Sequence, residues 1–221
     1  IPYGFNASGS EFDEVSFIET DVLEMVTSFS KLTQAKQWRF VVIHSLQQTN
    51  MVMSALEKVC NCGVEAGIWE KSNIHERPGG ARLAWGFENW SIGFYSKDGV
   101  RNMGMYNFAP EESRLNIIKV PCVTKKSVNP LGFIVNPYQK PVGLASWFVS
   151  HFSEKSDWVL DLCCGTGSCL AAALLNSRHG CAVDKSSMQI DFVKSWIMTL
   201  ESNWNLFEES QIKGHGSEGN E

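Results

Sequence analysis

The residues whose types and spacing best suit the binding of a ligand are two glycines and two acids between residues 161 and 184. Residues 158–168 are typical of a buried strand that ends at Asp161, followed by a tight turn that contains Gly165 and Gly167. Because glycine has no side chain, such a turn lets the backbone approach a ligand closely. Asp184 ends the next predicted strand, 180–183, where a carboxylate can accept hydrogen bonds from ribose hydroxyls. The spacing predicts the nucleoside-binding half of an α/β sheet.

The details of the turn discriminate among nucleoside ligands. A dinucleotide-binding turn would have a third glycine where Leu170 stands, and a phosphate-binding P-loop would need Gly-Lys-Ser/Thr, which the sequence lacks. Residues 169–175, rich in alanine, indicate a helix directly after the turn. The pattern Asp-Leu-x-x-Gly-x-Gly-Ser before this helix resembles the first motif of S-adenosylmethionine-dependent methyltransferases. A purely structural turn that binds nothing is the alternative.

The order of the motifs indicates which group of methyltransferases the chain resembles. Lys140, Pro141 and Leu144 form a Lys-Pro-x-x-Leu element that leads into an amphipathic stretch at 147–152 and then into the cofactor strand. This order is similar to that of the permuted, beta-class-like amino-methyltransferases of nucleic acid bases, which act on adenine N6 or cytosine N4. The resemblance implies a Rossmann-like α/β fold with a mostly parallel sheet, an antiparallel hairpin on its C-terminal side and a circularly permuted motif order.

The resemblance also implies the cofactor, S-adenosylmethionine, and the residues that hold it. Asp161 and the glycine turn would hold its methionine end and Asp184 its ribose, with Lys185 and Ser186 beside the adenine. The Lys-Pro helix would pack against the same cofactor, and no metal is implied. The implied cofactor-binding residues are Asp161, Cys163, Gly165, Thr166, Gly167, Asp184, Lys140 and Pro141.

The catalytic motif of the family is an acidic or polar residue followed by Pro, Pro and an aromatic. Pro2 and Tyr3 match the second proline and the aromatic, Ile1 stands at the first proline, and the acid would fall immediately before Ile1. In this chemistry the aromatic stacks on a base swung out of the helix, while acceptors bond the protons of its poorly nucleophilic amine. The Pro-Tyr form favours adenine, because cytosine enzymes of the family more often carry serine before the prolines.

Apolar periodicity places further elements ahead of the cofactor half. It predicts a helix over 14–32, a strand over 38–44, a helix over 51–59, a strand over 64–70 and a hairpin formed by 81–87 with 91–96. Trp69, Lys71 and Asn73 resemble a Trp-x-Lys-x-Asn strand end of the same methyltransferases, and Glu88 resembles the glutamate that opens their next strand. Polar residues at the edge of a sheet are the alternative for each.

These elements predict one methyltransferase domain over residues 1–200. Residues 1–97 would be its catalytic half, 98–135 its variable, target-recognition-like loops and 136–200 its cofactor-binding half, with a polar tail at 201–221. The loop segment is basic, which suits contact with nucleic acid, although an ordinary solvated loop is the alternative. Its cations are Arg101, Arg114, Lys119, Lys125 and Lys126.

Composition limits the class of protein. The seven cysteines lack the spacing of a zinc site and predict reduced thiols in an intracellular compartment, the cytoplasm or the nucleus. No run of eighteen apolar residues exists, so we expect no membrane span. The net charge of −5 is unusual for a nucleic-acid enzyme, which suggests local basic clusters or a partner chain.

Several functions are consistent with these observations. The preferred one is an enzyme that methylates adenine N6 in nucleic acid, with DNA favoured over RNA as the partner and with a homodimer or a second chain as candidate assemblies. A catalytically inactive subunit of the same fold, serving as a scaffold or nucleic-acid-binding partner, is the main alternative. Methylation of an RNA base is a further alternative. A guanine amino-methyltransferase of RNA and methyltransferases of small molecules or protein glutamines are also alternatives, although these normally have the cofactor motif first.

Overall fold

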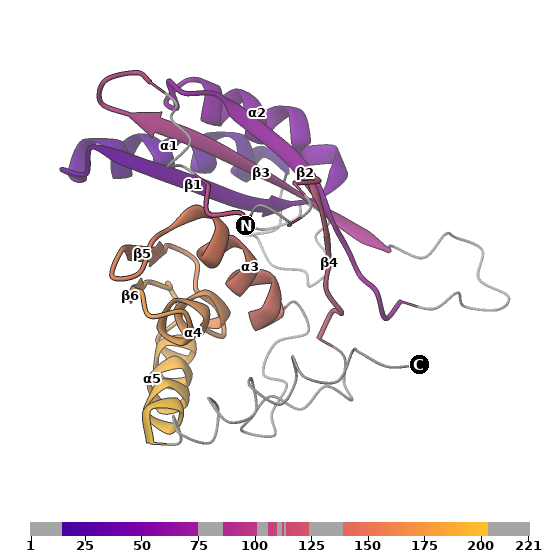
Figure 1. Ribbon diagram of the computed structural model, residues 1–221, viewed down its shortest axis with the longest axis vertical. Coiled ribbons are helices and arrows are strands. Elements are labelled where there is room, and N and C mark those ends of the chain that lie inside the picture. Colours follow the sequence, from indigo (N-terminus) through magenta and orange to yellow (C-terminus); the bar gives the residue numbers. More distant parts are fainter. Residues whose placement is uncertain are drawn as a thin grey trace, which may run out of the picture.

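A four-stranded sheet with helices on both faces forms the larger part of the fold (Figure 1). The computed structural model describes residues 15–74, 86–100, 106–109, 112, 114–123 and 139–202. The strands lie in the order β1-β3-β2-β4, with β3 antiparallel to both β1 and β2 and β4 parallel to β2. Their bounds are Gln37–His44 for β1, Val64–Glu70 for β2, Phe87–Ser96 for β3 and Ile117–Lys119 for β4.

The central strand β3 corrects the predicted hairpin. Of the predicted hairpin, residues 81–85 lie outside the described residues, and Phe87 and residues 91–96 do not oppose each other but belong to one continuous strand. Glu88 and Asn89 look like a polar turn in the sequence, yet they pair with Trp69 and Ile68 of β2. Asn89 lies on the face of the strand that also carries Ser91 and Gly93. Glu88 shares the face of Trp90, where it pairs with lysines, so strand pairing accommodates both polar residues. The antiparallel hairpin therefore consists of β2 and β3.

Helices α1 (Val15–Leu32) and α2 (Thr49–Glu57) cover one face of this sheet. Val22 and Val26 of α1 and Val52 and Leu56 of α2 are each at most 1% exposed, at the i, i+4 spacing that places them on one side of a helix. They pack with Val42 and other residues of β1 in one apolar cluster. A short 3-10 helix, Leu46–Gln48, connects β1 to α2.

Helix α3 (Val142–Phe152) covers the opposite face (Figure 1). Leu144, Phe148 and Phe152 lie four residues apart and are buried against the aromatic face of β3. The rings of Trp90 and Phe148 are 5.5 Å apart, and those of Phe94 and Phe152 are 6.1 Å apart. This aromatic packing attaches α3, the helix that follows the Lys-Pro element, to the four-stranded sheet, which is called the hairpin sheet below.

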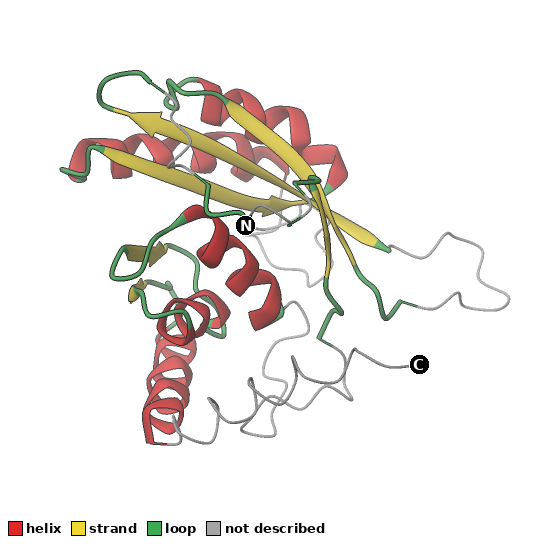
Figure 2. Ribbon diagram, viewed as in Figure 1, coloured by secondary structure: helices red, strands yellow, loops and turns green. Residues whose placement is uncertain are grey.

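A second, two-stranded sheet carries the cofactor motif (Figure 2). Strands β5 (Trp158–Asp161) and β6 (His179–Ala182) are parallel, and α4 (Ser168–Leu175) connects them. Helix α5 (Ser187–Ser202) follows β6 and packs on α4 through Trp196, which is buried beside Ala171. This βαβα order is the arrangement that the glycine turn predicts.

The structure agrees with most of the predicted architecture. It is an α/β fold, and the helices and strands predicted at 14–32, 38–44, 51–59, 64–70, 169–175 and 180–183 begin and end within two residues of the observed bounds. The expected mostly parallel sheet is instead mixed among the described strands, because β3 inserts antiparallel between β1 and β2. The segment 98–135, expected as loops, contains β4. Within the described ranges no helix is long and apolar enough to cross a membrane.

Candidate cofactor site

The glycine turn between β5 and α4 adopts a backbone that favours glycine. Gly165 has φ of 48° and Gly167 has φ of 80°, both in the left-handed region. A Cβ atom on Gly167 would lie 2.9 Å from Cγ2 of Val193, so this glycine allows α5 to approach closely. A Cβ on Gly165 would meet no atom within 4 Å. Gly165 therefore presents its backbone to open space, where a ligand can reach it.

Asp184 is bound directly to this turn. Its Oδ2 accepts a hydrogen bond of 2.8 Å from the Gly165 N–H, and its Oδ1 accepts one of 2.9 Å from the Ser186 N–H. The Cys164 N–H donates to the Val183 carbonyl at 2.9 Å, which aligns the two strand ends. An ionised carboxylate offers about four acceptor positions, so Asp184 retains acceptor capacity for two ribose hydroxyls.

Asp161 gives the site a second carboxylate. Its Oδ1 accepts a hydrogen bond of 3.1 Å from the Cys163 N–H, which fixes the first residues of the turn. Burial raises the pKa of Asp161, and the nearby charge of Asp184 raises it further, against the effect of that hydrogen bond. A cationic ligand group beside Asp161 would relieve this cost. The site therefore suits a nucleoside that carries positive charge.

Lys140 and Pro141 reach the turn from the start of α3, the helix that precedes β5. Ser168, the first residue of α4, donates from Oγ to the Lys140 carbonyl at 2.6 Å. Pro141 caps the start of α3 with φ of −64° and ψ of 141°, a position where its missing N–H costs nothing. The Nζ of Lys140 lies 3.0 Å from Oε2 of Glu88. The Lys-Pro element thus connects the turn with the hairpin sheet.

The described structure brings most of the predicted site residues into one region. Hydrogen bonds join Cys163 to Asp161 and Gly165 to Asp184, and Lys140 binds Ser168 at the end of the turn. Thr166 and Gly167 belong to the same turn, and Pro141 directly follows Lys140 at the start of α3. Pro2 and Tyr3, the predicted catalytic residues, lie outside the described residues.

Two residues that sequence reasoning did not assign to the site also contact it. Ser168 closes the contact between α4 and Lys140, and its position directly after the turn is the only signal that could have identified it. Glu88 resembles a family glutamate in the sequence, but its ion pair with Lys140 joins residues that are far apart in the chain.

The cysteines around the turn do not form a nucleophilic or metal site. Burial raises the pKa of the Cys164 thiol to about 11 and that of Cys169 to about 12, so both are protonated at neutral pH. All seven cysteines are free thiols in the structure. In the ranges that the structure covers, no group of three His, Cys, Asp or Glu side chains is arranged to hold a metal ion.

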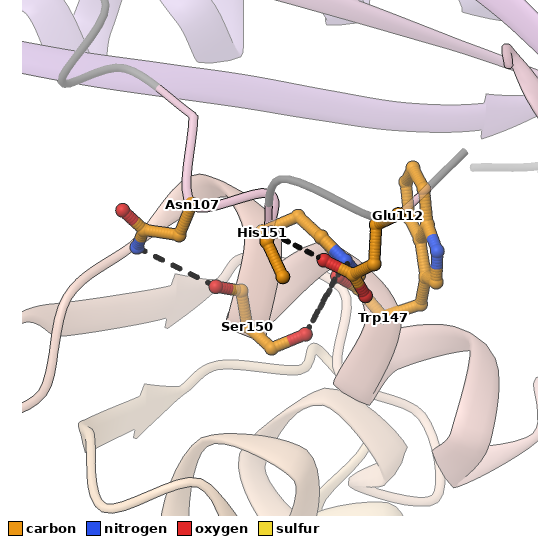
Figure 3. Close-up of polar contacts among 6 residues, drawn as sticks. Asn107, Glu112, Trp147, Ser150 and His151 are labelled. Carbon is orange, nitrogen blue, oxygen red and sulfur yellow. Dashed lines mark hydrogen bonds and ion pairs between the residues drawn. The ribbon is translucent and has the colours of Figure 1, made fainter. Parts of the chain in front are cut away.

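A Ser-His-Glu cluster at the end of α3 looks like a hydrolytic triad but lacks its chemistry (Figure 3). Ser150 Oγ lies 3.3 Å from His151 Nδ1, and His151 Nε2 lies 3.2 Å from Glu112 Oε1. However, Nδ1 is also 2.6 Å from the Trp147 carbonyl oxygen, which can only accept. Nδ1 therefore carries a proton and cannot take one from Ser150. A hydrogen bond from Nε2 to ionised Glu112 requires a second proton on the ring, so the cluster is an ion pair that attaches Glu112 to α3.

Comparison with solved structures supports the fold. M1.HpyAVI, crystallised with S-adenosylmethionine, superposes with a TM-score of 0.66 at 19% identity and covers 80% of this chain and 82% of its own. TTHA0409 of Thermus thermophilus, a candidate DNA modification methylase complexed with the same cofactor, has a TM-score of 0.53 at 19% identity, covering 85% and 79%. The cytosine-N4-specific PvuII DNA methyltransferase has 0.55 at 14% identity, covering 80% and 70%.

The sequence itself also matches a family model. No curated protein sequence matches the chain significantly. The model of the N6/N4 methyltransferases, described as DNA methylase, matches residues 34–210, which include every described element from β1 to α5. This match covers most of the chain. The chain therefore belongs to the N6/N4 family of DNA methylases, amino-methyltransferases whose cofactor is S-adenosylmethionine.

Proposed function

We propose that this chain transfers a methyl group from S-adenosylmethionine to the N6 amine of adenine in DNA. The observation that carries the proposal is the turn whose Gly165 amide is hydrogen-bonded to Asp184, with Asp161 at its start and Lys140 at its far side. Pro2 and Tyr3 support adenine over cytosine, since the Pro-Tyr form is commonest among adenine enzymes of the family.

The residues of the site match the chemical groups of this cofactor. Asp161 would face the cationic amino-acid end, because a positive group there offsets the burial of its carboxylate. Lys140 supplies a cation for the carboxylate of the same end. Asp184 would accept hydrogen bonds from the two ribose hydroxyls. Gly165 leaves space for the ligand beside the turn.

The bound cofactor would supply an activated methyl group on a positively charged sulfur. The protein must then place an exocyclic amine in line with that methyl group, because positioning provides much of the rate in such a transfer. The nitrogen gains the methyl group and releases one proton, so acceptors beside it favour the reaction. Tyr3 would stack on the extrahelical base, an interaction worth about 1–3 kcal/mol per base.

DNA contact is proposed for the basic residues of the 98–135 segment. Among its described residues, Arg114 and Lys119 are exposed, and Lys119 pairs with Glu70 of β2 at 3.2 Å. Phosphate contacts by such cations make binding sensitive to salt. Because the net charge is −5, DNA binding would depend on such local contacts, and each phosphate contact makes the affinity fall as salt rises.

A methyl-transfer assay with product identification tests the function. The protein is incubated with labelled S-adenosylmethionine and with single- and double-stranded DNA and RNA oligonucleotides, and the nucleosides are separated by mass. We expect N6-methyladenine from DNA, lost in Asp184→Ala and in Tyr3→Ala. N4-methylcytosine or methylated RNA would overturn the assignment of the base or of the nucleic acid. Cofactor binding without transfer to any oligonucleotide would indicate the inactive-subunit alternative.

A further inference from the structure

A compact charged cluster lies where the hairpin sheet meets the Lys-Pro element. Glu88 Oε1 is 2.7 Å from Lys71 Nζ, and Glu88 Oε2 is 3.0 Å from Lys140 Nζ. The two lysine side chains are 15% and 25% exposed, and Glu88 is 15% exposed. Each carboxylate oxygen thus holds a different ammonium, in surroundings where solvent screens the interaction weakly.

The cluster is built on a rigid base. The indole of Trp69 is 2% exposed, and both lysine ammonium groups lie over its ring, at 5.4 Å for Lys71 and 5.9 Å for Lys140. Trp69 Nε1 donates to the Val120 carbonyl at 2.7 Å, and Glu88 lies directly opposite Trp69 in the β2–β3 ladder. The position of Glu88 is therefore fixed by the strand pairing.

A continuous path of contacts leads from this cluster to the glycine turn. The Lys140 side chain binds Glu88, and the Lys140 carbonyl accepts the hydrogen bond from Ser168 at the first residue of α4. Ser168 directly follows Gly167, the last residue of the turn. A shift of Lys140 would therefore move both its ammonium and its contact with the turn.

Burial and charge act in opposite directions on Lys140. Burial lowers the pKa of Lys140 and the neighbouring Lys71 lowers it further, whereas the charge and the hydrogen bond of Glu88 raise it. Among the described residues, Lys71 after the end of β2 and Glu88 near the start of β3 are the charged groups that act on Lys140. Without the Glu88 charge, Lys140 would lose its proton at a lower pH.

We infer that Glu88 is a positioning residue for the cofactor site, holding Lys140 charged and in place to bind the carboxylate of S-adenosylmethionine. This inference rests on the proposed function, because it requires that cofactor beside Lys140. Glu88 acts through Lys140 and touches neither the cofactor nor the base. Lys71 occupies the other oxygen of Glu88 and so fixes the orientation of its carboxylate.

The chain offers a matched control for this cluster. Glu70 Oε2 pairs with Lys119 Nζ at 3.2 Å, so it is also a carboxylate–lysine pair on the hairpin sheet. Its side chains are 43% and 67% exposed, and the ion pair involves no residue of the turn. Exposed pairs of this kind contribute little. Glu70→Gln therefore removes the same charge without disturbing Lys140.

The test is calorimetric titration of the full chain with S-adenosylhomocysteine and S-adenosylmethionine at neutral and alkaline pH. We expect Glu88→Gln to weaken binding by about tenfold at neutral pH, in the range seen for groups that orient a ligating residue. The loss should grow at alkaline pH as Lys140 loses its charge, whereas Glu70→Gln should match the wild type. In Glu88→Gln combined with Lys140→Met, binding should be no weaker than in Lys140→Met alone.

The outcomes separate this inference from the proposed function. A wild type that binds neither ligand contradicts the proposed function itself. A wild type that binds, with Glu88→Gln unchanged or additive with Lys140→Met, overturns only the inference. Should Glu88→Gln fail to fold, as judged by circular dichroism, Glu88→Asp replaces it, because the shorter side chain keeps the charge but cannot reach both lysines. Affinity that is unchanged at both pH values in Glu88→Asp would also overturn the inference.

Discussion

The two sheets of this molecule are stabilised in different ways. In the four-stranded sheet, Trp69, Ile92 and Phe94 are at most 2% exposed, and helices pack on both faces. In the two-stranded sheet, Trp158 of β5 is 73% exposed and Leu160 is 39% exposed. The hairpin half, which is the four-stranded sheet with its helices, is therefore held by extensive apolar packing. In the cofactor half, residues 158–202, apolar burial lies between α4 and α5 at Ala171 and Trp196, whereas the two strands are held by backbone hydrogen bonds and by the contacts of the turn.

Two paired strands alone are marginally stable in water, and regions with few buried apolar contacts open most readily. The cofactor half combines such strands with a turn that leaves space beside Gly165. We therefore expect a rigid platform in the hairpin half and a ligand-dependent order in the cofactor half.

The largest expected effect comes from deleting one aromatic ring in each half. Phe94→Ala should lower the free energy of unfolding by about 3–5 kcal/mol, because it removes a fully buried ring that contacts Phe152 and Tyr106. Trp158→Ala should change it by about 0.5 kcal/mol or less, because that side chain is exposed. Urea unfolding measures both. Equal losses would contradict the proposed difference between the halves.

Cofactor binding should stabilise mainly the cofactor half. At a ligand concentration of about 100 times Kd, S-adenosylhomocysteine should add about 2.7 kcal/mol to the free energy of unfolding. In hydrogen exchange, residues 158–186 should become more protected, whereas β3 should change little because packing already holds it. Protection spread evenly over both sheets would mean that the halves respond as one unit.

The two glycines of the turn should separate stability from binding. Each substitution by alanine costs about 1–2 kcal/mol of backbone strain, and Gly167→Ala should cost more because its Cβ would meet Val193. Gly165→Ala should cost only the strain but should weaken cofactor binding, because its methyl group enters the open side. Thermal unfolding and calorimetry distinguish the two effects. If Gly165→Ala lowered the stability more than Gly167→Ala, Gly165 could not face the open space that the proposed cofactor site requires.

A small pH effect should come from the segment that lies over α3. The Ala109 N–H and then His151 hydrogen-bond to Glu112 and lower the pKa of its carboxyl group. Ionised Glu112 therefore stabilises the fold above the pKa of an unfolded glutamate, and this contribution is lost as pH falls through the lower folded pKa. Glu112→Gln should cost less than about 1 kcal/mol, because the side chain is 45% exposed.

Measurements at acidic pH, where Glu112 of the wild type becomes protonated, serve as the control for this prediction. Wild-type and Glu112→Gln unfolding free energies, measured by urea at several pH values, should differ near neutral pH and converge as the pH falls. A difference that persists or grows in acid would show that the cost of the substitution comes from packing rather than from charge.

The sequence predicts contacts between residues that are close in the chain better than contacts between distant segments. The turn with Gly165 and Gly167 and the acid at Asp184 lie within one βαβ unit, so their spacing alone predicts that they meet at one site, where a hydrogen bond joins them. The contact of Glu88 with Lys140 is set by the pairing of β2 with β3 and by the packing of α3, which the sequence does not encode locally.

The strands show the same limit. Residues 37–44 and 64–70 are rich in apolar residues and are predicted as strands within one residue. In contrast, β3 is interpreted as part of a hairpin because Glu88 and Asn89 interrupt its apolar pattern. The short β4 has too few residues for periodicity and forms only beside β2. The roles of Pro2 and Tyr3 remain predictions, since both lie outside the described residues.

The central claim is that the glycine turn and Asp184 form the binding site of S-adenosylmethionine. One titration tests this claim most directly. The full chain is titrated with S-adenosylhomocysteine as wild type, as Asp184→Ala and as Asp191→Ala, whose carboxylate on α5 is exposed and pairs only weakly with Lys194 at 3.8 Å. We predict saturable binding by the wild type and by Asp191→Ala, with at least about a tenfold loss in Asp184→Ala. Binding that survives unchanged in a folded Asp184→Ala protein would contradict the claim.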